Sequence, residues 1–171
     1  MKLTRIAVAA ALLTLASAGA AFAQSDTGSG TIIVLRPLTV TNDADIDFGV
    51  VVRPSAGTGT VTIATTGART LGAGLVGVGA GTTAAQFTLD GEGGQSVSIT
   101  IPANFLMANG GDDLTVTTSN DLAGGLTTQS LSGSLGSAGS LVVLIGGEVT
   151  LADTTPTGTY TGTFTVSAAY N

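Results

Sequence analysis

The sequence predicts an all-β domain built as an antiparallel β-sandwich. Three observations lead to this fold class. Threonine, valine and isoleucine recur in short segments in which apolar and polar residues alternate, the period-2 pattern of a half-buried strand. Glycine, asparagine and aspartate separate these segments at short spacing, as turns do in antiparallel sandwiches. Beyond the first 23 residues, apolar residues nowhere follow the 3.6-residue period of an amphipathic helix.

The first 23 residues have the pattern of a removable signal peptide. Lys2 and Arg5 precede an apolar run, and small residues follow up to Ala23. Signal peptidase recognises this order of a charged, an apolar and a small-residue region. The apolar run is shorter than the roughly 20 residues of a membrane-spanning helix. We therefore expect cleavage before Gln24, export to the periplasm, the outer cell surface or the extracellular space, and a single mature domain over residues 24–171 without membrane insertion.

The mature chain opens with a polar stretch and then an unusually apolar segment, Ile32 to Val40. Two interpretations of this segment stay open. It is the first strand of its own domain, or residues 24–40 donate a strand to another molecule. Pro37 lacks an amide donor, which confines the segment to a sheet edge or a bulge. The residues that share one face of the extended segment are Ile32, Val34, Leu38 and Val40.

Alternating patterns predict several further strands in the middle of the chain. Serine and threonine occupy their polar positions, and the branched Cβ of threonine suits a pleated, half-exposed face. Pro102 is expected to end one of them. The predicted strands contain Val61–Ile63, Ala85–Leu89, Val97–Ile101 and Leu114–Val116.

Residues 141–145 are apolar on both faces and predict a buried central strand. Gly146-Gly147 is expected to turn this strand into another one over residues 148–151. Two stretches rich in glycine, serine and threonine, residues 72–83 and 120–140, are expected to be loops, the second partly ordered by its leucines.

The strongest alternation lies at the C-terminus. Between Thr159 and Tyr170, apolar residues take most of the alternate positions, and threonines take the positions between them. This pattern predicts one long strand with an apolar inner face. An uncovered edge on such a strand favours pairing with another chain. The candidate assembly residues on this strand are Tyr160, Phe164, Val166 and Tyr170.

The charge of the mature chain excludes one class of partner. Arg36, Arg53 and Arg69 face eleven carboxylates, and no lysine remains after the signal peptide, so the net charge is −8. Such a surface repels phosphate backbones, and three scattered arginines do not form the basic stripe that nucleic-acid binding needs. We expect no nucleic-acid partner.

Catalytic chemistry is poorly supplied. The sequence has no histidine and no cysteine, and the mature chain has no lysine, so the commonest general bases and nucleophiles are absent. A pair of carboxylates would suffice for glycoside hydrolysis, but no tryptophan is present to form a sugar platform. We expect a non-enzymatic protein without a cofactor.

Three carboxylates, Asp43, Asp45 and Asp47, are spaced two residues apart, as at the start of a calcium-binding loop. The rest of that loop is missing, because Phe48 stands where a turn glycine is needed and Pro54 where a bidentate glutamate is needed. The three aspartates are a weak calcium candidate. Otherwise they form a solvated entry to a strand.

Three segments together resemble the bacterial DUF4402 family of exported proteins: residues 37–49, residues 84–91 and residues 158–171. The D-x-D-F-G motif at residues 45–49 and the closing strand are more distantly similar to spore-coat-U and archaic chaperone–usher pilin domains. The resemblance implies an immunoglobulin-like, pilin-like sandwich whose groove is filled by an N-terminal strand of the next subunit. It also implies a homo-polymer, with a periplasmic chaperone and an usher as partners.

Two functional hypotheses follow. The first is an extracellular structural subunit that self-associates by β-strand addition into a fimbria-like filament or surface coat, through residues 32–40 and the edge beside residues 159–170. The second is a monomeric periplasmic or surface recognition domain that binds calcium or glycans through residues 43–47 and the glycine-rich loops.

Overall fold

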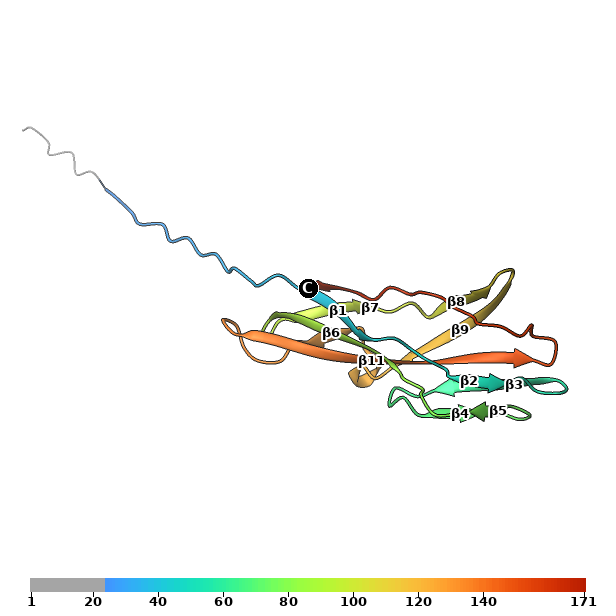
Figure 1. The fold of residues 1–171 in the computed structure, drawn as a ribbon. Coiled ribbons are helices and arrows are strands. Elements are labelled where there is room, and N and C mark those ends of the chain that lie inside the picture. The colour runs from blue at the N-terminus through green and yellow to red at the C-terminus, as the bar shows by residue number, and fades with distance from the viewer. Residues whose placement is uncertain (1–23) are drawn as a thin grey trace, which may run out of the picture. The chain divides into compact units, whose positions relative to one another are not determined.

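The computed structural model describes residues 24–171 (Figure 1). The predicted signal peptide, residues 1–23, lies outside the described residues. The chain divides into two units, Met1–Ile33 and Val34–Asn171. In the first unit, residues 24–33 form neither helix nor strand, so all the regular structure described below belongs to the second unit.

The second unit contains twelve strands and one short 3-10 turn, and every strand pair is antiparallel, which confirms the predicted fold class. Within residues 24–171, no helix has the length and apolar character that crossing a membrane requires. The elements are β1 (Thr39–Ala44), β2 (Val50–Val52), β3 (Thr58–Ile63), β4 (Arg69–Leu71), β5 (Val76–Val78), β6 (Ala85–Glu92), β7 (Ser96–Thr100), β8 (Asn104–Asn109), β9 (Asp112–Asn120), η1 (Ala123–Gly125), β10 (Thr128–Ser130), β11 (Ala138–Ala152) and β12 (Ser167–Tyr170).

Two sheets pack face to face around the first half of β11. One is a seven-stranded sheet with the order β1-β6-β11-β3-β4, in which β9 also pairs with β11 and β8 with β9. The other is a three-stranded sheet with the order β10-β7-β12. Their alternating apolar residues meet in one cluster, which we call the first core and which explains why the period-2 pattern predicted β6 and β7 correctly. The buried residues of the first core are Ala85, Phe87, Leu89, Val97, Ile99, Leu122, Leu131, Val143, Ile145 and Val166.

A second core lies along the other half of β11, where that strand pairs with β3 on one edge and with β9 on the other. Phe164 connects the two cores: its ring stacks on Phe105 at 4.8 Å between centroids and meets Phe87 edge-on at 5.8 Å. Aromatic pairs favour both geometries. The buried residues of the second core are Val61, Leu75, Phe105, Val116 and Val149.

The predicted turn at Gly146-Gly147 is wrong, because both residues lie inside the continuous 15-residue strand β11. A Cβ on Gly146 would collide with the carbonyl oxygen of Ile63, and a Cβ on Gly147 would lie 2.9 Å from Cγ1 of Val116. Glycine inside a strand often marks a close approach of neighbouring groups. Here it lets β11 pass from the first core to the second without a break.

The predicted C-terminal strand is shorter in the structure than its alternation suggests. Only Ser167–Tyr170 forms a strand, against β7, and Thr161 forms an isolated bridge with Ala108 of β8. The segment between these contacts leaves one sheet and joins the other, so no single neighbour pairs with its whole length.

The two predicted loops contain some regular structure. Residues 72–83 include β5, which pairs with β2, and residues 120–140 include η1 and β10. Leu122 and Leu131 are buried in the first core, which confirms that the second loop is partly ordered.

Candidate functional site

The N-terminal arm, which we define as residues 24–34, is exposed along its whole length. It ends in three consecutive apolar residues, Ile32, Ile33 and Val34, and Ile32 is 84% exposed. Neighbouring apolar side chains that are exposed together commonly mark a surface that binds another molecule. The arm contains two of the predicted assembly residues, Ile32 and Val34.

The other two assembly residues predicted in this segment lie in a different environment. Leu38 and Val40 pack against the first core, and β1 pairs with β6 of the same chain, with Val40 opposite Leu89. The predicted segment 32–40 is therefore divided: its second half completes its own sheet, and its first half is exposed.

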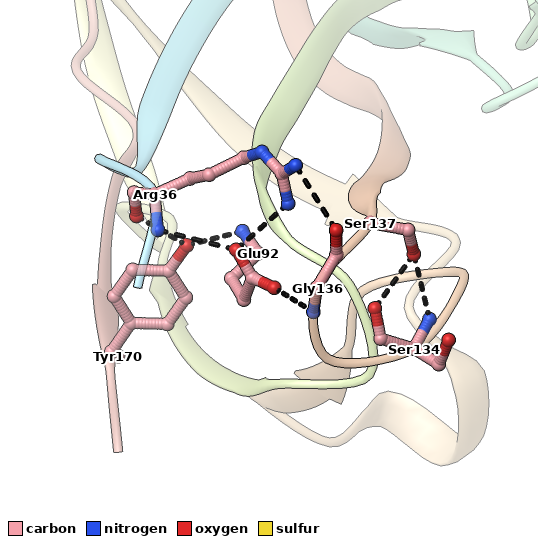
Figure 2. A network of polar contacts seen from close by, with 6 residues as sticks. All are labelled: Arg36, Glu92, Ser134, Gly136, Ser137 and Tyr170. Atoms are coloured by element: carbon pink, nitrogen blue, oxygen red, sulfur yellow. Dashed lines mark hydrogen bonds and ion pairs between the residues drawn. The ribbon is translucent and has the colours of Figure 1, made fainter. Parts of the chain in front are cut away.

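A network of polar contacts holds the chain at the point where the arm ends (Figure 2). Arg36 Nη1 donates a hydrogen bond to Oε2 of Glu92 at 2.9 Å, and the Arg36 amide donates to the same oxygen at 3.3 Å. Tyr170 Oη accepts from the Glu92 amide at 2.6 Å and donates to the Arg36 carbonyl at 3.0 Å. We call Arg36, Glu92 and Tyr170 the clasp, because they join the segment that precedes β1 to the ends of β6 and β12.

A buried carboxylate lies at the centre of the clasp. The side chain of Glu92 is 3% exposed and that of Arg36 is 46% exposed, and theirs is the only salt bridge within residues 24–171. The Gly136 amide donates to Oε1 of Glu92, and the Gly136 carbonyl accepts from Arg36 Nη2 at 3.2 Å. Ser137 donates to the Ser134 carbonyl and shapes the loop that presents Gly136. Both carboxylate oxygens of Glu92 therefore accept hydrogen bonds from groups of the same chain.

Sequence reasoning did not find the clasp. The one sequence feature that pointed to it is Arg36, the only charged residue in the apolar segment 32–40. Its partner Glu92 is 56 positions away, and no local pattern relates the two.

The pKa of Glu92 lies below its ordinary value of about 4.3, chiefly because the Gly136 amide donates to the carboxylate; contacts from Arg36 lower it further, and burial opposes both. A carboxylate with a lowered folded-state pKa contributes stability that is complete above its unfolded-state pKa and is lost as the pH falls through the folded-state value. The clasp should therefore weaken below about pH 4.3.

Replacing Glu92 with glutamine should lower the melting temperature at pH 7 by several degrees, because the ion pair with Arg36 is lost. The variant should also lose less stability than the wild type when the pH falls below about 4.3, because the titrating group has been removed. Thermal unfolding by circular dichroism across this pH range measures both effects, with the exposed Glu148→Gln as the control. Parallel pH profiles for Glu92→Gln and the wild type would show that Glu92 does not stabilise the fold through its charge.

The predicted C-terminal assembly residues lie mostly inside the domain. Phe164 and Tyr170 pack against the first core, and Val166 is buried in it. Tyr160 differs: its hydroxyl donates to the Pro156 carbonyl at 2.9 Å, and its side chain lines a cleft.

This cleft has a volume of about 950 Å³ and lies beside the second core. Residues 46–53, which include β2, form one wall, and residues 155–160 form another. Most of its side chains are apolar, among them Phe48, Met107 and Leu114. Arg53 Nη1 donates to the Thr155 carbonyl at 2.5 Å and connects the two walls.

The three aspartates of the calcium candidate each bond to a different group. Asp43 accepts from Thr88 Oγ1 at 2.5 Å, Asp45 accepts from Asn42 Nδ2 at 2.7 Å, and Asp47 accepts from the Gly49 amide at 2.7 Å. Gly49 has a φ of +69°, which favours glycine, so Asp47 and Gly49 form the turn that leads into β2. Within residues 24–171, no group of three or more acidic, histidine or cysteine side chains is placed to hold a metal ion.

All three arginines of the described chain donate hydrogen bonds to the domain itself. Arg36 and Arg53 do so as described above, and Arg69 donates to the carbonyls of Phe48, Val50 and Gly79. Arg69 thereby holds the turn at Gly49 and the beginning of β2 in place.

Comparison with known proteins agrees with the resemblance to the DUF4402 family. Residues 38–170 match the family model described as a domain of unknown function, DUF4402. The match takes in every strand from β1 to β12, whereas the N-terminal arm lies outside it. No curated protein and no solved structure matches the chain. The chain belongs to the DUF4402 family.

Proposed function

We propose that this protein is an exported, non-enzymatic structural subunit that self-associates by β-strand addition into a filament or coat at the cell surface. The observation that carries the proposal is the N-terminal arm, which presents Ile32, Ile33 and Val34 to solvent. Isoleucine and valine favour strands, and an extended apolar segment without a partner is suited to pairing with the sheet of another molecule.

The clasp supports this role for the arm. Because Arg36 is held by Glu92 and Tyr170, the chain preceding it departs from a defined point of the domain. The following residues, from Leu38 onwards, are occupied in their own sheet and first core. A donated strand would therefore consist of residues 24–34, which is shorter than the 24–40 segment expected from the sequence.

The composition and the resemblance to pilin domains support the remaining parts of the proposal. Without histidine, cysteine or mature lysine, the chain offers few groups for catalysis, which favours a structural role. Archaic chaperone–usher pilins, to which the D-x-D-F-G motif is similar, join subunits by strand addition. A periplasmic chaperone and an usher would be the partners that keep such an arm from pairing prematurely.

The proposal predicts that two aspartates placed in the arm abolish assembly. The mature chain starting at Gln24 should form a ladder on a denaturing gel when it is not boiled and a monomer when it is boiled. Ile32→Asp/Val34→Asp should give monomer in both lanes, because burying unpaired carboxylates against a sheet is strongly unfavourable. Ser25→Asp/Ser29→Asp adds the same charge to the polar part of the arm and should keep the ladder. A wild-type protein that is monomeric without boiling would contradict the proposed function.

A further inference from the structure

Exposed apolar side chains of this protein concentrate in two places. Eleven large hydrophobic residues are exposed within residues 24–171, and three of them are Ile32, Ile33 and Val34 of the arm. Four more lie on β2 and β5, which pair as a two-stranded sheet. We call this sheet the valine ribbon, and its exposed residues are Val50, Val52, Val76 and Val78.

The valine ribbon forms part of the cleft beside the second core. Val50, Val52 and Val78 line the cleft. The apolar side chains of a strand are usually buried against the rest of the domain. A row of exposed valines beside a cleft therefore indicates a surface that another molecule covers.

We infer that this cleft receives residues 31–34 of the arm of a second copy of the chain, an inference that rests on the proposed function and names its acceptor site. Two apolar surfaces, one on the arm and one in the cleft, would cover each other. In an extended strand Ile32 and Val34 would face the wall at residues 46–53, and Ile33 would face the opposite wall at residues 155–160.

The size of the cleft fits a peptide segment. Its volume of about 950 Å³ lies at the upper end of the range of small-molecule pockets, and it is bounded by residues 46–53 on one side and by residues 155–160, which form no strand, on another. Residues 157–160 of the second wall make no backbone–backbone hydrogen bond within the described chain, so they retain donors and acceptors for an added strand, whereas the Pro156 carbonyl is occupied by Tyr160 Oη. Residues 24–34, fully extended, reach about 36 Å at about 3.3 Å per residue, which exceeds the roughly 10 Å length of the three-residue strand β2 in the wall of the cleft.

The position of the clasp favours a second copy as the source of the strand. Arg36 lies before β1, and the cleft begins at Ile46, after β1. The six residues of β1 separate them by about 20 Å of extended chain. To enter the cleft of its own subunit, the arm would have to reverse direction at Leu35 and run back beside β1.

A matched pair of variants tests the acceptor site. Val52 is 51% exposed and lines the cleft, whereas Val142 is 47% exposed on β11 and does not line it. Val52→Asp should weaken association of the mature chain by roughly 100-fold, because the carboxylate would be buried without a partner. Val142→Asp should leave association unchanged. Light scattering after size-exclusion chromatography measures association, and circular dichroism checks that both variants are folded.

Disulfide trapping tests the same contact in a chain that has no cysteine of its own. Ile33→Cys in one preparation and Thr157→Cys in another should form a mixed dimer under oxidised glutathione, because Thr157 lines the cleft. Ile33→Cys with Val142→Cys should not. A chain that carries both Ile33→Cys and Thr157→Cys should link to other copies rather than to itself.

The results separate failure of this inference from failure of the proposed function. Association that survives Val52→Asp, or trapping at Val142 instead of Thr157, would overturn the acceptor site and leave strand addition intact. Trapping within a single chain would show that the arm fills its own cleft and would also overturn the inference. A wild-type mature chain that never associates would contradict both.

Discussion

Replacing Gly146 with valine is expected to destabilise the domain by about 3 kcal/mol or more. A Cβ at this position would collide with the Ile63 carbonyl oxygen and lie 2.9 Å from Oγ of Ser119 and 3.0 Å from the Ala64 carbonyl carbon. Two of these atoms belong to the backbone, so the larger side chain cannot be accommodated by a change of rotamer. The sheet itself would have to move apart where β11 connects the two cores.

Urea unfolding followed by circular dichroism measures the loss. Val142→Thr, at an exposed position on the same strand, is the control and should change the free energy of unfolding by less than about 0.5 kcal/mol. Equal stability of Gly146→Val and the wild type would mean that β11 does not pass as closely to its neighbours as the structure places it.

Replacing Leu89 with alanine is expected to cost about 2–5 kcal/mol, because the cavity left in the first core would not fill completely. Leu89 is fully buried and lies on β6, opposite Val40 of β1 and Leu141 of β11. For a domain of this size, a loss of that magnitude lowers the melting temperature by roughly 5–15 °C.

The exposed Leu126 provides the control, since Leu126→Ala removes the same atoms from a side chain that lies in solvent. Differential scanning calorimetry at one protein concentration compares the two variants, because association would itself raise the melting temperature. If Leu89→Ala melts within a degree or so of Leu126→Ala, the first core is not the main source of stability.

Alternation in the sequence predicted the strands whose two faces have different surroundings. β6 and β7 each bury every second residue in the first core, and their alternation is clear for that reason. Local patterns did not predict strands that depend on distant partners. β5 is three residues long and forms because Val76 and Val78 pair with Val52 and Val50, which no neighbouring residue signals.

Glycine misled the prediction at one position for a physical reason. A glycine pair commonly indicates a turn, but Gly146 and Gly147 serve close packing between three strands, a requirement that arises only once β3 and β9 have assembled. The candidate site shows the same limit. The apolar character of Ile32, Ile33 and Val34 is visible in the sequence, whereas the cleft is built from segments that are distant along the chain.

The clasp gives the domain a mechanical property. In a filament of the proposed kind, tension along the fibre would enter each subunit through the arm and meet Arg36 first. Arg36 is bonded to Glu92 at the end of β6 and to Tyr170 at the end of β12, and these two strands belong to opposite sheets. The pulling force would therefore be shared between both sheets instead of peeling β1 from one of them, and acid that protonates Glu92 would lower the force at which a subunit opens.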